Sequence, residues 1–222
     1  MVAYLSENAD KRIFEALRQE GFEIIPLAPF GALSFPVDTH ADMLLLQAGE
    51  KIFKHGDYFV EGKFENIFEP MGSKYPNDVL LNIAIVGKHA FANTRYASKT
   101  VLAYLEENGF EIHHVTQGYA HCSTLIVSEN AIISADEGIC REAQKCGIDA
   151  LLISAGYIDL APYEYGFIGG ACGSYGGRIY LCGSLKYHPD GEVIRNFCKS
   201  HQKEIVELLD APISDIGGIL IK

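Results

Sequence analysis

The chain has 222 residues, 48 % of them hydrophobic and 21 % charged, a composition typical of a soluble globular protein. The formal net charge of −11 argues against a nucleic-acid or anionic-membrane partner, because phosphate binding requires clustered Lys and Arg. No run of about 18 apolar residues predicts a membrane span, and the N-terminus lacks the features of a signal peptide. Six cysteines without a signal, and without a Cys-x-x-Cys motif, therefore predict reduced thiols and a cytoplasmic location.

Helices followed by strands recur along the chain. The first helix has Asn8 as its expected N-cap and Gly21 as its stop. It is followed by the strand EGFEIIPL, of which NGFEIHHV is a near copy later in the chain. Apolar residues at helical spacing predict four helices, at residues 9–19, 94–107, 136–146 and 190–209.

Pairs of strands joined by tight turns precede these helices. Hairpins are expected at residues 42–57, 80–94, 123–136 and 173–185, and the first of them has a weak or absent helix after it. The last strand, GGILIK at residues 217–222, has no partner downstream. It gains one if the N-terminal segment MVAYLSENAD pairs with it.

These elements form five strand–strand–helix–strand units, one of them split across the two termini. A recurrence of roughly 35–50 residues indicates a repeat or propeller architecture, and pairing the ends removes exposed strand edges. We therefore predict an α/β propeller of five ββαβ units with pseudo-fivefold symmetry, forming a single domain over residues 1–222. An open α/β sheet is the alternative.

Equivalent positions in such a ring converge on its axis, so the segments that open the units are the candidate site. They read DTHADM (38–43), YPNDVL (75–80), YAHCST (119–124), GGACGS (169–174) and SDIGGI (214–219). The side chains expected around one small cavity are His40, Asp42, Asn77, Asp78, His121, Cys122, Cys172 and Asp215.

The unit order and two motifs resemble the penteins, the guanidino-group-modifying enzyme superfamily that includes arginine and agmatine deiminases, amidinotransferases and dimethylarginine hydrolases. The chain carries His40-Ala-Asp42 and, two units later, His121-Cys122-Ser-Thr. The resemblance implies a cysteine nucleophile at Cys122, with His40 and Asp42 as its catalytic partners, and substrate binding by the other side chains of the ring. The sequence departs from the family in GFIGGACGSYGG, where an acidic residue is absent, and Asp215 before Gly217-Gly218 is a loose match.

Each candidate has a structural alternative. A thiolate attacks electrophilic carbon when positive charge lowers its pKa, a charge that His40 could supply, but Cys122 could equally pack as a small apolar residue. His121 could activate Cys122, although neighbours in a strand point to opposite faces. Likewise, His40 could be a plain turn histidine, and Asp215 could prepare the turn at the two glycines after it.

Two other kinds of site are weaker alternatives. The glycine tract at residues 169–177 precedes a strand rather than a helix, so it favours close backbone approach near the axis over phosphate binding. A metal site from His40, Asp42, His121 and Cys122 has suitable ligand types but no helical ligand spacing. We accordingly predict no metal and no cofactor.

Two functions follow. The first is a cysteine-dependent hydrolase or transferase that acts on a C–N bond of a small guanidine, amidine or amide-like substrate. The second is a non-catalytic protein of the same fold that binds a small ligand or a protein partner, which the short chain and the missing acid favour.

Overall fold

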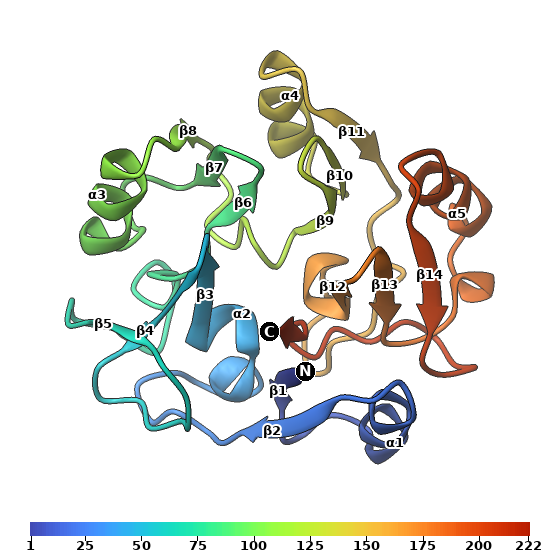
Figure 1. Ribbon diagram of the computed structural model, residues 1–222, viewed down its shortest axis with the longest axis horizontal. Helices are drawn as coiled ribbons and strands as arrows, with labels where there is room; N and C mark the ends of the chain where they lie inside the picture. The colour runs from blue at the N-terminus through green and yellow to red at the C-terminus, as the bar shows by residue number, and fades with distance from the viewer.

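The computed structural model describes all 222 residues and arranges five three-stranded sheets around a common axis (Figure 1). In every sheet an antiparallel strand pair is followed by a third strand that runs parallel to the second. The strands are, in unit 1, β3 (Leu45–Ala48), β4 (Lys51–His55) and β5 (Glu65–Ile67); in unit 2, β6 (Ala84–Val86), β7 (His89–Ala92) and β8 (Glu111–His114); in unit 3, β9 (Thr124–Ser128), β10 (Ala131–Ser134) and β11 (Asp149–Leu152); in unit 4, β12 (Cys172–Tyr175), β13 (Arg178–Leu181) and β14 (Glu204–Glu207); and in unit 5, β15 (Leu220–Ile221), β1 (Val2–Ser6) and β2 (Glu23–Leu27).

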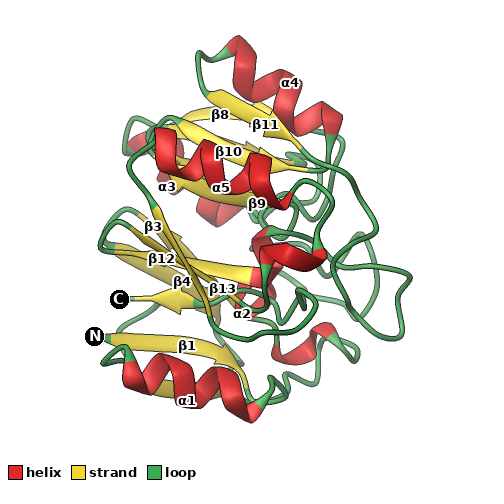
Figure 2. Cartoon of the chain, turned by 90° about the vertical axis from the view of Figure 1, so that its right-hand side faces the viewer, coloured by secondary structure: helices red, strands yellow, loops and turns green.

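Four of the five units carry a helix between their second and third strands, on the outside of the ring (Figures 1 and 2). These helices are α1 (Lys11–Gln19), α3 (Lys99–Glu107), α4 (Glu137–Lys145) and α5 (Gly191–Ser200). Unit 1 has no helix at this place, which confirms the expected absence. The short helices α2 (Ala41–Leu44), η1 (Val37–Thr39), η2 (Gly169–Ala171) and η3 (Leu185–Tyr187) lie in the connections.

The helix starts differ from the sequence prediction. Asn8 is not the N-cap of α1; the Asp10 carboxylate caps it by accepting a hydrogen bond from the Arg12 backbone N–H over 2.8 Å. Ser98 caps α3, which begins at Lys99 and thus five residues later than expected from the apolar pattern. Apolar periodicity alone therefore placed both helix starts too early.

The fourth predicted helix was too long. Helix α5 ends at Ser200, and residues 204–207 form strand β14 instead of a further helical turn. The turn between them places Gln202 at φ 58°, a left-handed conformation that glycine usually supplies. Because no glycine marks this helix end, no residue before Pro212 indicated where the helix stops.

The two ends of the chain pair as neighbouring strands. Val2 N–H donates to the Lys222 carbonyl over 2.7 Å, and Lys222 N–H donates to the Val2 carbonyl over 2.9 Å. Strands β1 and β15 continue this pairing in antiparallel register. The expected closure of the ring through its termini is confirmed, and it leaves both ends near the axis (Figure 1).

Apolar side chains fill the spaces between neighbouring units. Each of the five buried clusters joins two adjacent sheets; for example, Leu46 and Phe53 of unit 1 lie in one cluster with Val101 and Leu105 of unit 2. Burial of this kind fixes each unit against the next and so fixes the segments that meet at the axis.

No helix is both long and apolar enough to cross a bilayer.

Candidate functional site

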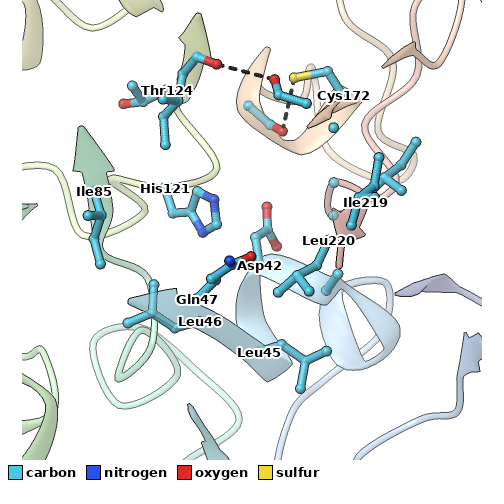
Figure 3. Close-up of a pocket in the computed structure, with 18 of the residues that line it drawn as sticks. Asp42, Leu45, Leu46, Gln47, Ile85, His121, Thr124, Cys172, Ile219 and Leu220 are labelled. Carbon is cyan, nitrogen blue, oxygen red and sulfur yellow. Dashed lines mark hydrogen bonds between the residues drawn. The ribbon is translucent and has the colours of Figure 1, made fainter. Parts of the chain in front are cut away.

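A cavity of about 300 Å³ lies on the axis, and all five units contribute to its wall. Unit 1 supplies Asp42 and Gln47, unit 3 supplies His121, and unit 4 supplies Cys172 (Figure 3). Unit 2 contributes isoleucines, and unit 5 contributes Gly217 to Ile221. Four of the five opening segments predicted to converge here line the cavity, whereas the segment at residues 75–80 does not.

Glycines allow the segments to approach closely at the axis. A Cβ on Gly169 would lie 2.4–2.6 Å from three backbone oxygens of residues 121, 122 and 124, and one on Gly173 would lie 2.4 Å from the Ile219 oxygen. Gly217 has φ +78°, and a Cβ there would lie 2.2 Å from the His40 Cβ. The glycine tract thus serves close backbone packing, as expected, because any larger residue would force the units apart.

The imidazole of His40 lies between two buried carboxyl groups. Its Nδ1 is 4.0 Å from Asp42 Oδ1 and 3.9 Å from Asp215 Oδ1. Burial lowers the pKa of His40 to about 4, so the ring is neutral near pH 7. His40 therefore brings no fixed positive charge to this cluster.

The two carboxyl groups differ in their partners. Asp215 accepts hydrogen bonds from the backbone N–H groups of Phe167 and Gly217, over 2.8 and 2.9 Å, and burial raises its pKa to about 6. Both oxygens of Asp42 are buried without a hydrogen-bond partner. Burial, followed by repulsion from Asp215, raises the pKa of Asp42 to about 8.

Cys122 is buried beside this cluster but does not line the cavity. The Asn82 side-chain amide donates a hydrogen bond to its Sγ over 2.9 Å, and the Asp42 carboxyl is close enough for each group to shift the pKa of the other. Burial, with added repulsion from Asp42 and Asp215, raises the pKa of Cys122 well above the ordinary value. The thiol is therefore protonated in the empty protein.

His121 and Cys172 face the cavity itself. Burial lowers the pKa of His121 to about 4, and its Nδ1 has no hydrogen-bond partner. Cys172 Sγ donates to the carbonyls of Ile168 and Gly169 over 3.3 and 3.6 Å, and burial raises its pKa. His121 and Cys122 thus differ in orientation as expected, although both lie in a turn rather than in a strand.

Besides Asp215, two predicted binding residues lie outside the cavity wall. Asp78 accepts a hydrogen bond from the Tyr119 hydroxyl over 2.8 Å, and burial raises the pKa of this carboxyl. Asn77 is exposed in the turn before it. Neither side chain contributes to the lining of the cavity.

Asn82 is the site residue that sequence reasoning missed. Besides its bond to Cys122 Sγ, it donates to the Asp42 carbonyl over 3.2 Å and accepts from the backbone N–H groups of His121 and Cys122. Asn82 belongs to unit 2 and therefore connects that unit to both unit 1 and unit 3. The only available signal was its position just after the opening segment of unit 2, in an otherwise apolar run.

Comparison with solved structures gives the same fold at low sequence identity. A Cys-to-Ser variant of DDAH from Pseudomonas aeruginosa complexed with citrulline matches with TM-score 0.57 and 14 % identity, over 98 % of this chain and 94 % of that one. Agmatine deiminase from C. jejuni matches with TM-score 0.54 and 10 % identity, over 96 % and 87 % of the two chains. The amidinotransferase SxtG from Microseira wollei, of the saxitoxin biosynthetic pathway, matches with TM-score 0.52 and 10 % identity, over 95 % and 78 %.

These neighbours are pentein-superfamily proteins, and the chain has the pentein fold, as the resemblance in the order of its units predicted. No curated protein matches its sequence. A family model matches residues 4–220, and the chain accordingly belongs to the family of unknown function DUF6873.

Proposed function

We propose that the protein binds a small organic cation of the guanidinium or amidinium class in the axial cavity and acts on one of its C–N bonds through a cysteine thiol. The observation that carries the proposal is the Asp42 carboxyl, which lines the cavity with two buried oxygens that lack partners. A buried polar group without a partner is costly. A planar cation with paired N–H donors is the ligand that satisfies both carboxylate oxygens at once.

Charge in the pocket supports a cationic ligand. Lys and Arg are absent from the cavity lining, and Asp215 lies close enough to Asp42 to raise its pKa. A bound cation offsets this repulsion and returns Asp42 to its ionised form. The ligand therefore supplies the positive charge that the empty site lacks.

Cys122 is the proposed nucleophile. Its Sγ accepts an N–H from Asn82, an interaction that favours the thiolate, whereas Cys172 Sγ faces carbonyl acceptors that favour the protonated thiol. A cation held by Asp42 would lower the pKa of the adjacent thiol. His40 would take the thiol proton and pass it to the leaving amine as the thiolate adds to the central carbon of the ligand and the C–N bond breaks; water, or an acceptor amine in a transferase, would then cleave the C–S bond and return the thiol.

Binding without turnover is the second candidate. It is favoured by the raised pKa of Cys122 and the neutral state of His40, since nothing in the empty site stabilises a thiolate by charge. In that case the cavity would select a cation and the thiol would remain a packing residue in the surrounding cluster.

One experiment separates these possibilities. A panel of guanidines and amidines is titrated calorimetrically, and release of ammonia or amine is measured for the wild type, Asp42→Asn and Cys122→Ala. We expect Asp42→Asn to abolish binding, and Cys122→Ala to retain binding but lose turnover. Binding with no turnover above the Cys122→Ala background would favour the second candidate, and no binding of any cation would refute both.

A further inference from the structure

Two histidines and a cysteine meet at the boundary between units 2 and 3, away from the residues of the axial site. His89 lies on β7, His113 lies on β8, and Cys146 is the C-cap of α4. Their potential ligand atoms all lie within 4.8 Å of one another. The units that supply them are neighbours in the ring (Figure 1).

The spacing of these atoms matches a tetrahedral zinc site. His89 Nδ1 is 3.0 Å from His113 Nε2, and Cys146 Sγ is 3.5 Å from both ring nitrogens of His113, so the thiol would rotate toward Nε2 on binding an ion. Tetrahedral Zn²⁺, with Zn–N of about 2.0–2.1 Å and Zn–S of about 2.3 Å, places two nitrogens about 3.3 Å apart and a nitrogen and a sulfur about 3.6 Å apart. We infer that this cluster binds Zn²⁺ or a similar borderline transition metal, which would join units 2 and 3.

The surroundings suit a divalent cation. The Glu111 carboxylate lies 3.6 Å from His89 Nδ1 and is 72 % exposed, so it can rotate into the fourth ligand position or leave it to water. The imidazole of His113 stacks on Phe91 with ring centroids 5.0 Å apart, which fixes the orientation of that ligand. The three ligands are partly exposed, so the ion can enter from solvent.

Metal binding replaces interactions that the empty protein satisfies internally. The two imidazoles share one hydrogen bond, and the Cys146 thiol donates to the Glu142 carbonyl over 3.2 Å. On binding, Cys146 releases its proton to the buffer and both imidazoles coordinate as neutral rings with their protons on the other nitrogens. The expected ligand class is thus an ion that accepts two imidazoles and one thiolate.

The test is titration of the chelator-treated protein with Zn²⁺, and with Co²⁺ as an optical probe. We expect one equivalent to bind, a thiolate-to-cobalt absorption band, and a melting temperature that rises with zinc concentration. Cys146→Ser should abolish the band, and His113→Gln should weaken zinc binding more than tenfold. His114→Gln, on the adjacent exposed residue of β8, is the matched control and should behave as the wild type.

Far-UV circular dichroism checks that each variant is folded, and His89→Gln replaces either variant if one is not. Absence of stoichiometric binding would overturn the inference. Persistence of the cobalt band in Cys146→Ser would also overturn it, because another of the six cysteines would then be the ligand.

Discussion

Asn82 holds Cys122 through both ends of its amide: its Nδ2 donates to Sγ over 2.9 Å, and its Oδ1 accepts from the Cys122 backbone N–H over 3.2 Å. The same oxygen accepts from the His121 backbone N–H over 2.7 Å. One side chain of unit 2 thus sets the position of the turn that carries both candidate groups of unit 3. The interaction joins three units at the axis without a charge.

Replacing Asn82 with Ala should destabilise the fold. The change leaves the backbone N–H groups of His121 and Cys122 without an acceptor, at about 1–3 kcal/mol for each unsatisfied group, so we expect the free energy of unfolding to fall by about 2–6 kcal/mol. Urea denaturation measures this. Asn66→Ala, at an exposed position on β5, is the control and should change stability little; equal stability of the two variants would contradict the bridging role of Asn82.

Replacing Asp42 with Asn should stabilise the empty protein increasingly with pH. Because burial and Asp215 raise the pKa of Asp42 to about 8, the folded state holds a proton on it that the unfolded chain loses near pH 4. Stability from this group is therefore lost as the pH rises from about 4 to 8. Urea denaturation across this range should show Asp42→Asn gaining up to a few kcal/mol over the wild type; a pH-independent difference would be inconsistent with a raised pKa.

Replacing Gly217 with Ala should lower the free energy of unfolding by more than the backbone strain alone would. The residue has φ +78°, and the added Cβ would overlap His40 and push it from the two carboxyl groups. Gly109→Ala is the matched control, since Gly109 has φ +73° with open space around the position of a Cβ. Thermal or urea unfolding should show that the free energy of unfolding falls by about 1 kcal/mol in the control and by about 2–4 kcal/mol in Gly217→Ala. Similar decreases in the two variants would mean that the His40 side chain moves aside at no cost in stability.

Cysteine labelling in the ligand-free protein should begin at Cys146. Burial raises the pKa of Cys122, and this thiol is only 4 % exposed, whereas Cys146 is the one cysteine that is not buried. Mass spectrometry after brief iodoacetamide treatment should find Cys146 modified first, with Cys122 modified only on unfolding. Fastest labelling at Cys122 would instead show a thiolate already activated in the empty site.

The sequence predicted the ring because its signals are local and repeated. Each hairpin has its own turn, and the two ends of the chain each had a strand without a partner. Two features were not predicted from the sequence. One is the end of α5, where Gln202 adopts a left-handed conformation, and the other is strand β5, which follows a loop without a helix. These features depend on tertiary packing rather than on local residue preference.

The candidate site was predicted only in part, because the order of the units can be derived from the sequence but the orientation of single turn residues cannot. Ring order brought Asp42, His121 and Cys172 to one cavity, as expected. The sequence could not show that Cys122 lies outside the cavity wall, because the orientation of a turn residue depends on contacts such as those with Asn82. Nor could it place Asp78 against Tyr119, a contact across 41 positions of the chain.

Recognition of a cation by the Asp42 carboxyl can be measured by calorimetric titration with a guanidinium or amidinium compound at several pH values. We expect the affinity to rise between about pH 6 and 8, as Asp42 loses its proton, and to disappear in Asp42→Asn. We expect unchanged affinity in Asp78→Asn, at a buried acid outside the cavity wall. Equal binding by the wild type and Asp42→Asn would show that Asp42 does not recognise the cation.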